Sequence, residues 1–156
     1  MSYKLNVGAS KKMFNFSILK AKFNDIFIVN NGKFVVKAEL VQVLDYLKNT
    51  PDFGFDMLTS IIAVDLKDKI ELIYQLMSSK TSETLSVSYY TDDFTAPTVT
   101  EIYKSSNFDE CEIFDLFGIK FVGNQDLKRL FLPKSWLGHP LLKSYVQNDE
   151  RLVWND

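Results

Sequence analysis

The sequence predicts an α+β fold, with helices packed on a mixed, largely antiparallel sheet and an extended, irregular C-terminal tail. Three observations support this prediction. Apolar residues recur at helical spacing between residues 37 and 49. Three β-rich runs separated by polar turns follow between residues 58 and 91. After residue 122, isolated apolar residues lie among glycines and prolines without a sustained period.

The first half of the chain is expected to contain two helices and a β-hairpin. The helices are expected at residues 12–23 and 37–49, and the hairpin strands at 26–29 and 34–36. Asn31-Gly32 supplies the positive φ of a tight hairpin turn. Leu40, Val43, Leu44 and Leu47 form one apolar face of the second helix, which Pro51 follows.

The second half is expected to begin with an antiparallel meander and to end with one more helix. The meander strands are expected at residues 58–65, 70–77 and 85–91, and a short strand at 99–103. The helix is expected to run from an Asn107 N-cap, with Glu110 completing a capping box, to residue 117. Phe114 and Phe117 would lie on its core face, and Asp115 would point away toward polar partners.

The composition fits one globular domain. The 156 residues carry 18 Lys and Arg against 20 Asp and Glu, a net charge of −2, and 46% are hydrophobic. A chain of this length buries roughly 68–70% of the surface that it exposes when unfolded. The chain has no linker-like stretch, so residues 1–122 are expected as the core domain and 123–156 as an extended tail, whose apolar residues must pack on the chain's own sheet or on another subunit.

Two classes of protein are disfavoured, and the cysteine content indicates a compartment. Only Arg129 and Arg151 among the 18 basic residues are arginines, so bidentate donors for nucleic acid are few. No apolar run reaches the 18 or more residues that a membrane-spanning helix needs. Cys111 is the single cysteine, so it has no internal disulfide partner and is typical of a reducing, cytoplasmic compartment. We therefore expect neither nucleic acid binding nor membrane insertion.

Charges form two complementary blocks in the second half. Residues 101–118 sum to −4, and residues 119–144 sum to +4. Both blocks could be solvated surface. Glu110 and Glu112, however, point about 200° apart on a helix, so at least one of them is expected to face protein.

No cofactor or metal site is readable from the sequence. It lacks a dinucleotide-binding glycine motif, a phosphate-binding loop and the spaced cysteines of an iron–sulfur cluster. Cys111 and His139 are the minimum pair for a thiol nucleophile and its base, which keeps an independent thiol enzyme as one alternative. A buried cysteine and a loop histidine are the plainer interpretation.

Several motifs resemble those of the 30 kDa subunit of respiratory complex I, which is the NADH-quinone oxidoreductase subunit designated C. The main match comprises residues 110–121, Gly123, 126–129, 132–133, Trp136 and 138–141, and a second, weaker match comprises 55–58 and 63–65. The order is that of the family, whose signature reads Glu-Arg-Glu, then Asp-Leu-Phe-Gly-Ile, then two Gly-His-Pro turns. Cys111 replaces the family's Arg, Asn124 and Gln125 its first His-Pro, and Leu142 and Ser144 the last Arg and Asp.

The resemblance implies a non-catalytic structural and assembly subunit without a cofactor. It would belong to the peripheral arm of a proton-translocating NADH-quinone oxidoreductase, which as a whole transfers electrons from NADH to quinone. The alternative is the equivalent subunit of a membrane-bound energy-converting hydrogenase. The implied partners are the quinone-site and iron–sulfur subunits, and the implied location is peripheral, on the cytoplasmic face of the inner membrane. The interface residues would be Glu110, Glu112, Asp115, Arg129, Trp136, His139 and Lys143.

The purified chain is expected to be colourless, because the sequence offers no recognisable ligand set for flavin or iron. An absorption spectrum and an iron determination on the purified protein check this. A flavin band or stoichiometric iron would contradict the prediction.

Overall fold

The computed structural model describes residues 16–23, 26–29, 33–37 and 39–146. The main sheet has five strands in the order β1-β2-β5-β4-β3. Its strands are β1 (Ile26–Val29), β2 (Lys33–Val36), β3 (Met57–Asp65), β4 (Ile70–Met77) and β5 (Thr84–Thr91). Only β2 and β5 pair in parallel, so the sheet is mixed and largely antiparallel, as the sequence predicts.

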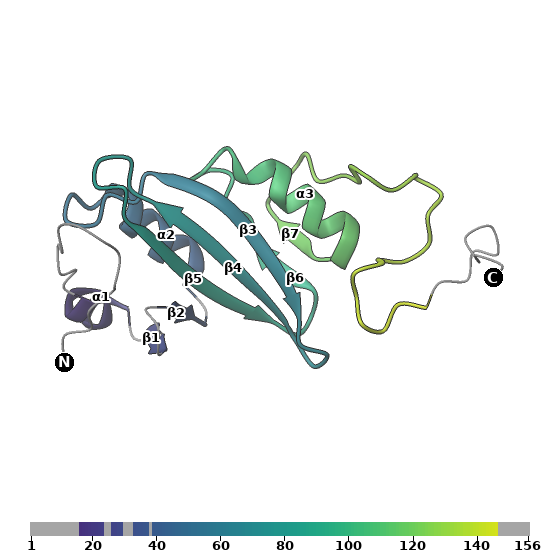
Figure 1. Cartoon of the computed structure of the whole chain (residues 1–156), viewed down its shortest axis with the longest axis horizontal. Helices are drawn as coiled ribbons and strands as arrows, with labels where there is room; N and C mark the ends of the chain where they lie inside the picture. Colours follow the sequence, from purple (N-terminus) through teal and green to yellow (C-terminus); the bar gives the residue numbers. More distant parts are fainter. Residues whose placement is uncertain (1–15, 24–25, 30–32, 38, 147–156) are drawn as a thin grey trace.

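The helices pack on and beside this sheet (Figure 1). They are α1 (Phe16–Lys22), α2 (Leu40–Asn49) and α3 (Ser106–Phe117). A second sheet of two parallel strands joins β6 (Thr95–Pro97) to β7 (Lys120–Val122). The start of the predicted first helix and the predicted Asn31-Gly32 turn lie outside the described residues.

The core lies between α2 and one face of the sheet. The four predicted apolar residues of α2 are all buried: Leu40, Val43, Leu44 and Leu47. Opposite them, alternate residues of the central strands have no exposed surface, namely Leu72, Tyr74, Leu76 and Val87. Alternation along β3 instead exposes 44% of Ile62 on the other face of the sheet.

Helix α3 lies beside the edge strand β3 (Figure 1). The register of β3 shifts between Leu58 and Ser60. Just beyond this shift, the Ile61 N–H donates to Asp109 Oδ2 at 2.9 Å. An exposed strand edge carries unpaired N–H and C=O groups, and here an acidic residue of α3 satisfies one of them. Burial raises the pKa of the Asp109 carboxyl.

Three local predictions around α3 are wrong. Residues 99–103 form a turn closed by the Tyr103 N–H and the Val99 carbonyl, and the strand lies earlier, in β6. The helix begins at Ser106, and Glu110 does not turn back to cap it. Phe114 is only half-buried, because the buried face of α3 carries Ile113 and the acidic residues as well.

Leu44→Ala should lower the free energy of unfolding by about 2–5 kcal/mol, because the side chain is fully buried and its removal leaves a cavity. Ile62→Ala is the matched control on the exposed face, with an expected loss below about 1 kcal/mol. Urea unfolding measures both values. Equal losses would show that the core does not lie where α2 meets the sheet.

Candidate subunit interface

Helix α3 ends at Gly118, which has the left-handed φ of 78°. Its N–H donates to the Phe114 carbonyl at 3.0 Å, as a C-terminal glycine cap does. The sequence predicts this helix end correctly. From Gly118 the chain passes through β7 and then returns along α3 as an irregular segment (Figure 1).

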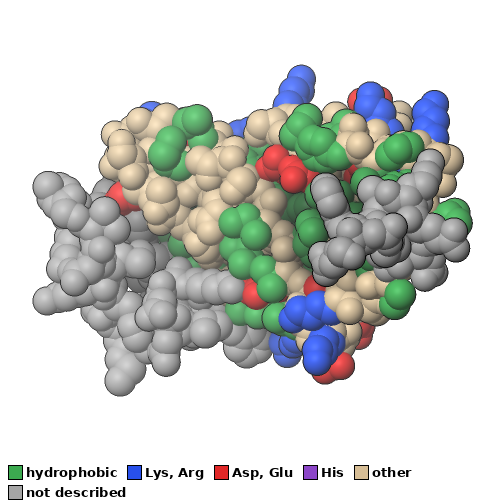
Figure 2. Space-filling view, turned by 45° about the vertical axis from the view of Figure 1, so that its right-hand side comes forward, with side chains coloured by type: hydrophobic (Ala, Val, Ile, Leu, Met, Phe, Trp, Pro, Cys, Tyr) green, Lys and Arg blue, Asp and Glu red, His purple; other side chains and the backbone are tan. Residues whose placement is uncertain are grey.

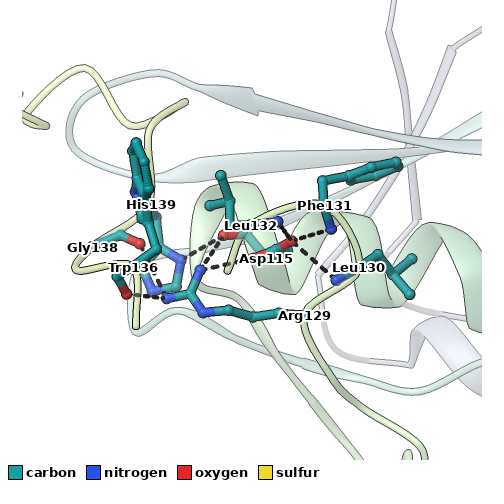
Figure 3. Close-up of polar contacts among 8 residues, drawn as sticks. All are labelled: Asp115, Arg129, Leu130, Phe131, Leu132, Trp136, Gly138 and His139. Atoms are coloured by element: carbon teal, nitrogen blue, oxygen red, sulfur yellow. Dashed lines mark hydrogen bonds and ion pairs between the residues drawn. The ribbon is translucent and has the colours of Figure 1, made fainter. Parts of the chain in front are cut away.

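The carboxylate of Asp115 holds that returning segment. Its Oδ2 accepts the backbone N–H groups of Leu130, Phe131 and Leu132 at 3.0, 2.8 and 2.9 Å. Its Oδ1 accepts Arg129 Nη1 at 2.7 Å, and this ion pair joins the acidic and basic blocks of the sequence. Four donors on one carboxylate fix four consecutive residues (Figure 3).

The Arg129 guanidinium extends this hold further along the segment. Its Nη2 donates to the carbonyls of Trp136 and Gly138 at 3.4 and 3.2 Å. One planar cation therefore joins α3 to two backbone carbonyls of the segment (Figure 3). We call these contacts among Asp115, residues 129–132, Trp136 and 138–139 the clasp.

His139 completes the clasp at the end of α3. Its Nδ1 lies 2.9 Å from the Asp115 carbonyl oxygen. The imidazole lies against Gly118, where an added Cβ would come within 2.6 Å of His139 Cδ2. Gly118 is thus required twice, once for its φ and once for the space that the ring occupies.

Glu110 holds a second loop in the same way, about one and a half turns earlier on α3. Its Oε1 accepts the Val99 N–H at 2.9 Å, and its Oε2 accepts Thr98 Oγ1 at 2.7 Å and Asn124 Nδ2 at 2.9 Å. Ser106 Oγ adds a longer bond of 3.3 Å to Oε1. These neutral donors satisfy a carboxylate that has no exposed surface.

The far end of the described segment is fixed to the sheet. The backbone N–H of Lys143 donates to Asp65 Oδ2 at 2.7 Å, at the end of β3. The pKa of the Asp65 carboxyl is lowered by this bond first and by the Lys67 N–H second. Residues 129–143 therefore lie between an anchor on α3 and an anchor on β3.

The predicted interface residues fall into two groups. Glu110 and Asp115 have no exposed surface, so their side chains hold the chain's own loops and do not reach the surface. Arg129, Trp136 and His139 are half-buried in the clasp, Glu112 is half-buried on α3, and the Lys143 side chain is exposed. The expectation that at least one of Glu110 and Glu112 faces protein is confirmed, because Glu110 has no exposed surface.

Three contributors are not predicted from the sequence as site residues. Asp65 and Asn124 each bond to a residue far away in the chain, and the sequence indicates only a capping role for Gly118. Asp65 does lie in a stretch that resembles the family, which is the one signal that could have identified it. No local pattern indicates that Asn124 binds Glu110, because 14 residues separate them.

The geometry does not support the thiol-enzyme alternative. Cys111 is buried, and its Sγ donates to the Asp126 carbonyl at 3.5 Å. His139 bonds instead to the Asp115 carbonyl at the end of α3. Over the described ranges, no group of three or more His, Cys, Asp or Glu side chains is arranged to hold a metal ion.

The electrostatics of Asp115 favour its charged form. Burial alone raises the pKa of this carboxyl, but the N–H groups of Leu132 and Phe131 and the Arg129 guanidinium outweigh burial and lower it. A carboxylate that is stabilised by backbone N–H groups and one arginine is a structural anchor. Fold and site together define a protein that presents a fixed, irregular segment on an α+β domain.

Comparisons with known proteins identify the family. Residues 34–151 match the family described as respiratory-chain NADH dehydrogenase, 30 Kd subunit. The NADH-quinone oxidoreductase subunit designated C in Trichlorobacter lovleyi is 38% identical over 117 residues, 71% of each chain. NADH-ubiquinone oxidoreductase subunit 9 of Reclinomonas americana is 29% identical over 143 residues, 86% of this chain and 70% of that protein.

Two solved structures share the fold. The trypsin-resistant fragment of Nqo5 is 28% identical, with a TM-score of 0.50 over 65% of this chain and 88% of that one. A chain of an archaeal membrane-bound sulfane sulfur reductase is 25% identical, with a TM-score of 0.59 over 72% and 71%. This chain belongs to the 30 kDa subunit family of respiratory-chain NADH dehydrogenase, and its partners are other subunits of such a complex.

None of the helices within the described residues is long and apolar enough to cross a membrane.

Asp115→Asn should lower the free energy of unfolding by about 1–3 kcal/mol at neutral pH, because Arg129 loses its charged partner. The folded-state pKa of Asp115 lies below the unfolded value of about 3.9, so its charge stabilises the fold above that pH. The difference in unfolding free energy between wild type and variant should therefore shrink as pH falls below about 4. Urea unfolding between about pH 3 and 7 measures it.

Asp126→Asn is the control for this experiment, because the Asp126 side chain is exposed. It should follow the wild type across the whole pH range. A gap between wild type and Asp115→Asn that stays constant down to about pH 3 would show that the Asp115 charge does not hold the segment.

Gly118→Ala should destabilise the chain through both strain and the clash with His139. In a His139→Ala background the same substitution should cost about 1 kcal/mol less, because the ring is gone. Gly54→Ala is the matched control: its φ is +59°, but the nearest atom lies 4.0 Å from the added Cβ. Denaturant unfolding of the wild type, the two single variants at 118 and 139 and the double variant tests this coupling. Equal costs of Gly118→Ala in both backgrounds would refute it.

Proposed function

We propose that this chain is a non-catalytic structural and assembly subunit in the peripheral arm of a proton-translocating NADH-quinone oxidoreductase. The complex as a whole would transfer electrons from NADH to quinone, and this chain would brace its quinone-site and iron–sulfur subunits. Family membership over residues 34–151 is the observation that carries the proposal. We place the chain peripherally, on the cytoplasmic face of the inner membrane.

The clasp suggests how such a subunit would work. An irregular segment left free would lose conformational entropy on binding a partner. Here Asp115 and Asp65 hold residues 129–143 at both ends before any partner arrives. The segment is therefore presented in a fixed shape, which lowers the entropic cost of assembly.

The seven proposed interface residues then divide by role. Glu112 and the Lys143 side chain are accessible enough to contact a partner directly, together with the open side of Trp136. Glu110, Asp115, Arg129 and His139 act as positioning residues that hold the surface in shape. Both groups would be needed for assembly, for different physical reasons.

A second candidate is the equivalent subunit of a related membrane-bound complex that does not use NADH, such as an energy-converting hydrogenase. The likeness to a chain of the sulfane sulfur reductase favours keeping it, since that complex is described as an archaeal respiratory membrane complex. The fold and the clasp serve either complex equally well.

Affinity purification separates the two candidates. The full chain, tagged in its own host, is isolated from detergent-solubilised membranes, and its companions are identified by mass spectrometry. We expect quinone-site, iron–sulfur and flavin-bearing NADH subunits, with NADH-dependent quinone reduction in the eluate. A nickel-site subunit in place of the NADH module would favour the second candidate, and a chain recovered alone would refute both.

A further inference from the structure

We propose that four exposed apolar side chains form a docking surface for a partner subunit whose facing surface is apolar with an acidic rim. They are Phe108 of α3 and Phe131, Leu137 and Leu141 of the clasped segment. The proposal rests on the proposed function and adds the chemistry of the partner. We call these four residues the docking patch.

The docking patch consists of large side chains that the chain leaves uncovered. Leu137 is 87% exposed, and Phe108, Phe131 and Leu141 are each more than half exposed. Phe108 and Phe131 meet edge to face, with ring centroids 6.1 Å apart. Two aromatic rings from different parts of the chain therefore form one exposed unit, and aromatic residues are enriched at the centres of protein interfaces.

The clasp holds the backbone beneath these side chains. The Phe131 N–H donates to Asp115 Oδ2 at 2.8 Å, and the Leu141 N–H donates to the Leu116 carbonyl at 3.1 Å. Both exposed side chains are thus attached to a backbone that is already bonded to α3. Preorganised apolar side chains lose little entropy when a partner covers them.

The exposed charges of the segment that carries Phe131, Leu137 and Leu141 indicate the sign of the partner's rim there. Arg129 is neutralised within the chain by Asp115, so the lysines supply the surface charge of the segment. Residues 119–146 carry four exposed lysines and one exposed aspartate, a net charge of 4 − 1 = +3 on their exposed Lys and Asp side chains. These residues are Lys120, Lys128, Lys134 and Lys143, and Asp126. Figure 2, which brings this side forward, shows hydrophobic side chains with both basic and acidic side chains near them.

A protein partner fits this surface better than a second copy or a lipid surface. Two copies would bring like charges together, which is unfavourable across an interface. A lipid surface suits an amphipathic helix, whereas this segment is irregular, and its free backbone groups would be costly among acyl chains. A protein with apolar pockets and acidic rim residues offers partners to both the backbone and the lysines.

Charge substitutions at Leu137 test the proposal in the assembled complex, with the tagged full chain expressed in its own host. Leu137→Glu should lower the recovery of partner subunits about tenfold, and Phe131→Glu should act likewise. Leu137→Lys should lose clearly less than Leu137→Glu, because an acidic rim repels only the glutamate. Ile62→Glu, on the exposed face of the sheet, is the matched control and should assemble normally.

The outcomes are distinguishable. Each variant should unfold at the same temperature as the wild type. If a variant does not fold, a photo-crosslinking residue at position 137 is used in its place to identify what contacts that position. Normal assembly of Leu137→Glu, or crosslinking of position 137 to a second copy, would overturn the docking patch. Equal losses for Glu and Lys would overturn the acidic rim.

Binding of the isolated wild-type chain to anionic phospholipid vesicles, lost in Leu137→Glu, would overturn the protein partner and assign the patch to a membrane. A wild-type chain without companions would instead refute the proposed function.

Discussion

The buried carboxylate of Asp115 is the interaction on which the functional side of this molecule depends. It is fully enclosed, yet three backbone N–H groups and one guanidinium satisfy it. A buried charge is costly unless it is paired and hydrogen-bonded, so the segment that supplies these donors has one favoured position. The irregular chain after β7 thereby acquires a defined path without any helix or strand of its own over its described residues.

Helix α3 organises the molecule through its acidic residues as much as through its apolar ones. Asp109 bonds to the edge strand β3, Glu110 to the loop after β6, and Asp115 to the returning segment. Each carboxylate meets backbone N–H groups that would otherwise lack a partner. With these three carboxylates, α3 joins β3, the loop after β6 and the returning segment on one side of the domain.

This arrangement separates the residues that hold the surface from the residues that form it. Buried charges stay within the chain, while exposed lysines and large apolar side chains remain available. Family membership and the proposed docking patch are consistent with each other, because a bracing subunit needs a stable surface more than it needs a reactive group.

The sequence by itself determined the fold class, the second helix (expected at 37–49 and found at 40–49), the antiparallel meander and the glycine that ends α3. These features follow from local periodicity and from φ preferences, which act over a few residues. It also determined the family, through short motifs in a fixed order. Only the tertiary structure decided that Glu110 and Asp115 face inward and that residues 99–103 form a turn. Those outcomes depend on donors up to 17 residues away, such as Thr98, Asn124 and Leu132, and spacing along one helix cannot reveal which loop will supply them.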